Sequence, residues 1–148
     1  DFHGRWEKVH TSPDAVTDIG HNPPAIRRNV ELLDSLLASG EYDSLVIVYG
    51  VMADKDLASI LPLLPRDAHY FFVAPDTARA LPADALAARA TAAGLKGIVA
   101  ASVSDGVSAA FAHASELEAA QHHPLIYIGG STFVVSEATQ SINENLTI

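Results

Sequence analysis

Short apolar runs alternate with longer alanine- and leucine-rich segments along this chain. Each short run is bounded by turn residues, which is typical of a strand that is buried on both faces of a sheet. The predicted strands are residues 15–19, 45–49, 69–73, 97–100 and 125–128.

The segments between these strands have the apolar spacing of helices. Residues 23–39 carry apolar side chains at successive spacings of four, three and four, which form one stripe. That stripe consists of Ile26, Val30, Leu33 and Leu37. Asn22 is the predicted N-cap, Pro23 takes the first helical position, and Gly40 follows the last turn. Further helices are predicted at residues 56–64, 82–93 and 105–120, and a short last helix begins near residue 131.

This alternation predicts an α/β fold, a Rossmann-like three-layer sandwich with a mostly parallel sheet of about six strands and helices on both faces. Residues 1–13 are expected to be peripheral and to carry an edge strand. The polar tail after Glu137 is also expected to be peripheral. In such folds ligands bind where the carboxyl ends of the strands meet, so the loops that follow the strands are the candidate sites.

The composition narrows the function classes. The chain has 148 residues, about half of them apolar, which suits one globular domain. Eighteen acidic residues against nine scattered Lys and Arg residues give a net charge of −9, which disfavours partners such as nucleic acid or an anionic membrane. With no cysteine, no export leader and no apolar run of about 20 residues, a cytoplasmic protein is expected.

The chain opens at Asp1, and its single methionine is Met52. Residues 1–148 are therefore interpreted as one domain cut from a longer chain. N-terminal processing is the alternative explanation for the missing initiator.

The first candidate loop is residues 18–23. It places the Asp18 carboxylate, the His21 imidazole and the Asn22 amide at the positively polarised start of a helix. Backbone N–H groups at such a helix end suit phosphate, and Asp18 suits the hydroxyls of a ribose. The alternative is that Asn22 only caps the helix, Gly20 makes a tight turn and His21 has no role.

The second candidate loop is residues 50–56, in which Lys55 lies between Asp54 and Asp56. One cation flanked by two anions suits a zwitterion, because Lys55 can face a carboxylate while an aspartate faces an ammonium group. The alternative is that Asp56 caps the next helix and Lys55 is a solvated charge.

The third candidate loop, residues 129–133, begins with two glycines, which allow close backbone approach. Ser131 either caps a helix or holds a ligand carboxylate. The Gly-Lys-Ser/Thr ending of a P-loop is missing, and the chain has no Gly-x-Ser-x-Gly elbow and no Gly-x-Gly-x-x-Gly fingerprint. None of the seven histidines has the spacing with Cys or Glu that structural zinc needs, so no metal site is predicted.

Together these loops resemble the C-terminal domain of the Mur ligase superfamily. Four elements follow the family's order over nearly the whole chain: Gly4-Arg5, Asp18-x-Gly20-His21-Asn22-Pro23, Asp54-Lys55-Asp56 and Gly130-Ser131-x-x-x-Val135-x-Glu137. The last two resemble the folate branch, the bacterial folylpolyglutamate synthases/dihydrofolate synthases. Gly20 stands where many members have alanine, a difference expected to change packing more than chemistry.

The resemblance implies an ATP-dependent ligase that adds L-glutamate to a folate or dihydropteroate through an acyl phosphate, with ATP and Mg²⁺ as cofactors. It also implies a partner, the enzyme's own N-terminal ATPase domain with the P-loop and most Mg²⁺ ligands, without which this fragment is expected to be inactive. By resemblance, Arg5 and Asp18 would contact ATP, His21 would lie near the reacting phosphate or the incoming glutamate, Asp54 and Lys55 would lie by the glutamate pocket, and Ser131 would hold a glutamate carboxylate.

Other functions stay open on the sequence alone. A cell-wall Mur ligase or a cyanophycin-type ligase would share this domain, whereas a non-catalytic Rossmann-like binding module would share only the fold. Whether the whole enzyme makes dihydrofolate, extends polyglutamate tails or does both depends on a folate pocket built mainly by the absent domain.

Overall fold

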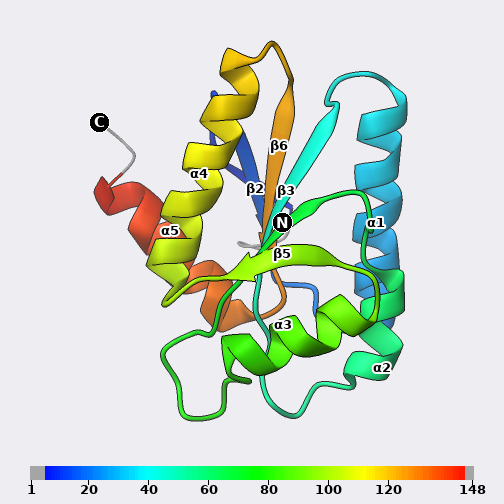
Figure 1. Cartoon of the computed structure of the whole chain (residues 1–148), viewed down its shortest axis with the longest axis vertical. Coiled ribbons are helices and arrows are strands. Elements are labelled where there is room, and N and C mark those ends of the chain that lie inside the picture. The colour runs from blue at the N-terminus through cyan, green and yellow to red at the C-terminus, as the bar shows by residue number, and fades with distance from the viewer. Residues whose placement is uncertain (1–5, 146–148) are drawn as a thin grey trace.

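The computed structural model describes residues 6–145 of the chain. The strands are β1 Glu7–His10, β2 Asp14–Asp18, β3 Ser44–Tyr49, β4 His69–Phe72, β5 Lys96–Val99 and β6 Pro124–Gly129. They form one sheet in the spatial order β1-β2-β6-β3-β4-β5 (Figure 1). β1 runs antiparallel to β2, and every other neighbouring pair is parallel.

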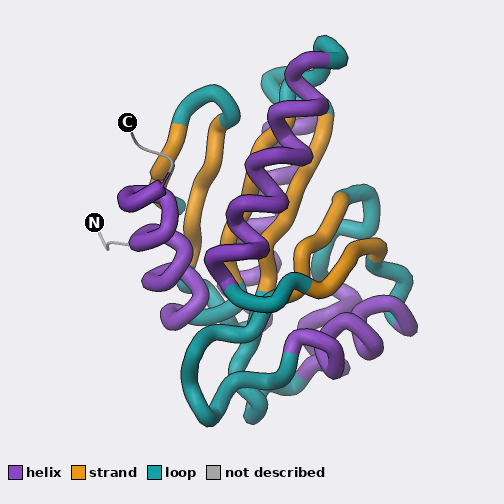
Figure 2. The backbone as a smooth tube through the Cα atoms, turned by 60° about the vertical axis from the view of Figure 1, so that its left-hand side comes forward, coloured by secondary structure: helices purple, strands orange, loops and turns teal. Residues whose placement is uncertain are grey.

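Helices lie on both faces of this sheet (Figures 1 and 2). They are α1 Pro23–Ala38, α2 Leu57–Ile60 with the 3-10 turn Leu61–Leu63, α3 Ala83–Ala92, α4 Val103–Ala119 and α5 Thr132–Asn145. Successive residues of a strand point to opposite faces, so Ile47 joins the apolar core under α1, α2 and α3, whereas Val48 joins the core under α4 and α5. The predicted three-layer α/β sandwich is therefore confirmed, and so is the edge strand within residues 1–13.

The ends of α1 follow the sequence signals. The Asn22 side chain accepts a hydrogen bond from the backbone N–H of Ala25 at 3.0 Å, which caps the helix start. Beyond the helix, Gly40 has a φ of +83°, the left-handed conformation that glycine adopts most readily. The predicted start and stop signals of this helix are confirmed.

The strand predicted at residues 97–100 is present as β5, but its predicted burial on both faces is wrong. β5 pairs with β4 and ends the sheet, and the side chains of Ile98 and Val99 are 54% and 46% exposed. The apolar run alone does not reveal the edge position, because that position depends on the spatial order of the strands.

The expectation for the chain after Glu137 is also wrong. α5 continues to Asn145, and Val134, Ala138 and Ile142 are each fully buried. These three residues lie four positions apart, so they form a narrow apolar stripe along the helix, whose second half is otherwise polar. The tail belongs to the core because this stripe packs against the rest of the molecule.

Two other helices differ in extent from the prediction. α4 begins earlier than residue 105, because the Ser102 side chain caps it by accepting from the backbone N–H of Asp105 at 3.0 Å. The second helix gives way to a 3-10 turn that contains Pro62, a residue that lacks the N–H needed to continue an α-helix. Among the described residues, no helix combines the length and the apolar character needed to cross a membrane.

Candidate functional site

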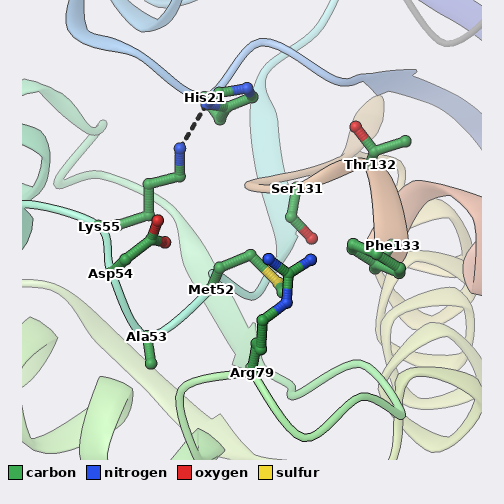
Figure 3. Close-up of a pocket in the computed structure, with 9 residues that line it drawn as sticks. All are labelled: His21, Met52, Ala53, Asp54, Lys55, Arg79, Ser131, Thr132 and Phe133. Atoms are coloured by element: carbon green, nitrogen blue, oxygen red, sulfur yellow. Dashed lines mark hydrogen bonds between the residues drawn. The ribbon is translucent and has the colours of Figure 1, made fainter.

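A pocket of about 530 Å³ lies at the carboxyl ends of the parallel strands (Figure 3). Four loops contribute to it: those that follow β2, β3, β4 and β6. The lining residues are His21, Met52, Ala53, Asp54, Lys55, Arg79, Ser131, Thr132 and Phe133. Folding therefore brings together four residues that the sequence marked separately: His21, Asp54, Lys55 and Ser131.

Glycines let the loops after β3 and β6 approach closely. The backbone N–H of Gly50 donates to the carbonyl of Gly129 at 3.3 Å. Gly130 has a φ of +108°, and a Cβ atom there would collide with the carbonyl of Gly50. The sequence signal of two adjacent glycines thus marks a real backbone contact, one that holds Ser131 beside the Lys55 loop.

His21 and Lys55 are hydrogen-bonded across the pocket. Nζ of Lys55 lies 2.6 Å from Nδ1 of His21. A protonated Lys55 has no lone pair, so it is the donor and Nδ1 is the acceptor. A neutral His21 then carries its proton on Nε2, which is left free to donate to another group.

The two aspartates that flank Lys55 have different environments. Asp54 is exposed and lines the pocket. Asp56 instead accepts a hydrogen bond from the Ser59 hydroxyl at 2.7 Å, and this bond lowers the pKa of Asp56. Asp56 therefore occupies the N-cap position of α2, as the structural alternative expected, but its carboxylate bonds to the Ser59 hydroxyl and not to a backbone N–H of the helix.

Ser131 immediately precedes α5 and is 3% exposed. Its Oγ accepts from the backbone N–H of Val134 at 3.1 Å, so the capping role is confirmed. An accepting hydroxyl keeps its own proton as a donor. The cap is therefore compatible with a second bond from Ser131 to a ligand in the pocket.

Asp18 is not part of the pocket lining. Its carboxylate is 5% exposed and accepts from the backbone N–H groups of Trp6, at 2.7 Å, and Gly20, at 2.6 Å. Burial, and then the charge of Asp18, raise the pKa of Tyr127, which lies on β6 and stays a neutral phenol. Asp18 thus lies behind the site and joins β2, the chain before β1 and the 18–23 loop.

The start of α1 does not offer free N–H groups to a phosphate, contrary to the sequence expectation. Pro23 and Pro24 have no N–H, and the next two N–H groups bond to the Asn22 side chain and the Asn22 carbonyl. The first turn of α1 is therefore already satisfied. Arg5, the other residue expected to contact ATP, lies outside the described residues.

Arg79 is the pocket residue that the sequence reasoning missed. It comes from the segment between β4 and α3, and its carbonyl accepts from the backbone N–H of Ala53 at 2.8 Å. The available signal was the rule that every loop at the carboxyl edge of a parallel sheet is a candidate, which applies to this loop as well. Within residues 6–145, no group of three or more His, Cys, Asp or Glu side chains is placed to hold a metal ion.

Three comparisons relate this chain to known proteins. The family model described as Mur ligase, glutamate ligase domain, matches residues 4–131. A curated relative from Halobacterium salinarum, a probable bifunctional folylpolyglutamate synthase/dihydropteroate synthase, is 36% identical over 135 residues. That alignment covers 91% of this chain but 16% of the relative, so the chain spans about a sixth of the relative's length.

Solved structures give the same picture of the fold. The folylpolyglutamate synthase of Mycobacterium tuberculosis, complexed with ADP and AMPPCP, aligns with a TM-score of 0.75 and 25% identity over 98% of this chain and 33% of that chain. The E. coli FolC structure in complex with DHPP and ADP aligns with a TM-score of 0.76 and 21% identity over 99% of this chain and 32% of that chain. At the latter identity the likeness supports the fold alone.

Proposed function

Since this chain belongs to the Mur ligase family through its glutamate ligase domain, we propose that it is the C-terminal domain of an ATP-dependent ligase that adds L-glutamate to a folate or dihydropteroate. In this proposal residues 1–148 form one domain, and a further N-terminal domain supplies the P-loop. The names of the relatives, folylpolyglutamate synthases among them, support this choice of substrate.

The observation that carries the proposal is the pocket itself. Loops separated by many residues in the chain bring an imidazole, an ammonium group, a carboxylate and a serine hydroxyl to one cavity. This set suits an amino acid, because Lys55 pairs with a carboxylate, Asp54 pairs with the ammonium group, and Ser131 donates to a carboxylate.

The reaction proposed for the whole enzyme has two steps. A carboxylate of the acceptor attacks the γ-phosphate of ATP, which gives an acyl phosphate and ADP. The amine of glutamate then attacks the acyl carbon, and phosphate leaves as the amide bond forms. The hydrogen bond to Lys55 orients His21, whose Nε2–H would donate to a phosphate oxygen or to the incoming glutamate.

The described residues offer a contact for the nucleotide but no group of ligands for the metal. The two backbone bonds to Asp18 leave lone pairs on its oxygens, so it is able to accept from ribose hydroxyls as well. Arg5 is proposed as the second ATP contact. By analogy with the family, we propose that the magnesium ligands lie mainly in the N-terminal domain, and we expect this domain alone to hydrolyse no ATP.

The test is amino-acid-dependent phosphate release by the full-length protein with ATP and Mg²⁺. L-Glutamate would be supplied with dihydropteroate, tetrahydrofolate or a UDP-muramyl acceptor in separate reactions. Turnover with either pteridine supports the proposal and shows which reaction dominates. Turnover with the muramyl acceptor alone would assign a cell-wall ligase, and no release with any acceptor would favour a non-catalytic binding module.

A further inference from the structure

The loop that carries Arg79, residues 75–80, is hydrogen-bonded to two other elements of the pocket, the loop after β3 and helix α5. On one side, Met52 and Ala80 form an antiparallel bridge, and the carbonyl of Arg79 accepts from the backbone N–H of Ala53. On the other side, the Glu137 carboxylate on α5 accepts from the backbone N–H of Asp76 at 2.8 Å. The position of the Arg79 backbone is therefore set by both the Lys55 loop and α5.

Glu137 belongs to the Gly-Ser-x-x-x-Val-x-Glu pattern, and none of the roles assigned so far uses it. Its hydrogen bond joins residues 61 positions apart in the chain. α5 is capped by Ser131, which lines the same pocket. The tether thus fixes the loop of Arg79 relative to the helix that Ser131 caps.

The charges around the pocket are unequal, although the whole chain is strongly acidic. The lining contains two basic side chains, Lys55 and Arg79, and one carboxylate, Asp54. Lys55 reaches toward His21, whereas the Arg79 side chain extends from the facing loop toward Ser131 and Met52 (Figure 3). Two separate cations and one anion complement an amino acid with two carboxylates and one ammonium group.

We propose that Arg79 is a specificity-determining residue that binds one carboxylate of the incoming dicarboxylic amino acid beside Ser131, and that Glu137 positions its loop. Lys55 binds the other carboxylate, and Asp54 faces the ammonium group. The planar guanidinium offers two parallel N–H groups, which match the two oxygens of a carboxylate. This inference rests on the proposed function, because it names how that same pocket selects its amino acid.

The experiment compares the full-length protein with its Arg79→Gln variant in the phosphate-release reaction. Arg28→Gln is the matched control, because Arg28 is exposed on α1 and does not line the pocket. We expect Arg79→Gln to raise the KM for L-glutamate by about tenfold to a hundredfold, as for the loss of a charged hydrogen bond. The KM for ATP should stay within about twofold. The preference for L-glutamate over L-glutamine should fall by a similar factor if Arg79 binds the side-chain carboxylate, which a specificity-determining role requires. An unchanged preference would place the α-carboxylate at Arg79 and overturn the role in specificity.

Two results would overturn the assignment. If Arg79→Gln raises the KM for ATP and leaves the KM for glutamate unchanged, Arg79 binds a phosphate instead. If both KM values match those of the control, Arg79 has no role in binding. In either case the unaltered protein still turns over glutamate, so the proposed function stands; a wild-type protein without glutamate-dependent turnover would overturn both.

The positioning role of Glu137 has its own pair of variants. Glu137→Gln keeps an oxygen that accepts from Asp76, whereas Glu137→Ala removes it. We expect Glu137→Ala to raise the KM for L-glutamate several-fold with little change in the KM for ATP. The KM for L-glutamate of Glu137→Gln should stay close to that of the unaltered protein. Equal kinetics for the two variants would show that the tether does not position Arg79.

Discussion

Nζ of Lys55 lies 2.6 Å from Nδ1 of His21, although 34 residues separate them in the chain. The two side chains come from the loops after β2 and β3, strands that flank β6 in the sheet. The contact is therefore a product of the parallel sheet, which brings the carboxyl ends of sequence-distant strands to one edge.

Replacement of Lys55 by glutamine should release His21 from a single tautomer. In the unaltered protein the neutral imidazole carries its proton on Nε2, because Nδ1 accepts from the ammonium group. We expect ¹⁵N NMR to show that tautomer for the neutral ring, and Lys55→Gln to weaken the preference. Turnover should fall by at least about tenfold, since one charged hydrogen bond is worth about 1.5–3 kcal/mol. An unchanged tautomer signal in the variant would contradict the contact.

Substitution of Gly20 by alanine should destabilise the domain. A Cβ atom at this position would lie 2.8 Å from Oδ1 of Asp18 and 2.9 Å from Cβ of Ala25, so both neighbours would have to shift. Asp18 is held by two backbone bonds and Ala25 lies in the capped turn of α1, which limits their movement. We expect Gly20→Ala to reduce the free energy of unfolding by about 1–3 kcal/mol in urea titrations. An unchanged midpoint would show that the loop relaxes freely.

The two roles of Ser131 can be separated by comparison with a second capping serine. Ser102 caps α4 as Ser131 caps α5, but it does not line the pocket. Ser102→Ala and Ser131→Ala should each lower the free energy of unfolding by about 0.5–2 kcal/mol. Only Ser131→Ala should also raise the KM for L-glutamate. If both variants change the KM equally, the effect of Ser131 comes from the helix and not from a ligand contact.

A pair of histidines at the other end of the sheet should make stability depend on pH. His69 stacks on His113 with ring centroids 4.4 Å apart, and burial, followed by the charge of His113, lowers the pKa of His69. The unfolded chain therefore binds a proton at His69 more readily than the folded domain does. Stability should fall as the pH drops through about 6.5, the ordinary value, toward the lower folded value. Urea midpoints between pH 7.5 and 5.5 should depend less on pH in His69→Gln than in the unaltered protein, and equal slopes would contradict this linkage.

Much of the architecture was predictable because each central strand is a short apolar run between turn residues. The run that became β3 lies between two parallel neighbours and is buried on both faces, as its composition indicates. β5 also contains two β-branched apolar residues, Ile98 and Val99, and yet these are exposed, because the order of strands in space decides which strand is last. The composition of a segment indicates its preference for forming a strand, whereas the exposure of that strand also depends on which strands lie beside it in the sheet.

The candidate site was predictable to the extent that its loops carry local signals. Ser131 follows two glycines, and Lys55 lies between two aspartates. Arg79 lies just before an alanine-rich segment and has no such signal beside it. Its place in the pocket comes from the backbone bond between its carbonyl and the N–H of Ala53, and from the tether of its loop to Glu137. Those bonds are non-local, so no pattern within the 75–80 loop announces them.

The second half of α5 tests the clearest error of the sequence interpretation. Ile142 is fully buried against the core that α4 and α5 share, whereas Ser136 on the same helix is exposed. Ile142→Ala should therefore cost about 2–5 kcal/mol of unfolding free energy in urea titrations, and Ser136→Ala should stay within about 0.5 kcal/mol. Equal midpoints for the two variants would mean that the chain after Glu137 is peripheral after all. A large difference would show that α5, the helix that carries Glu137, is anchored at its far end by a residue of the tail that was expected to be peripheral.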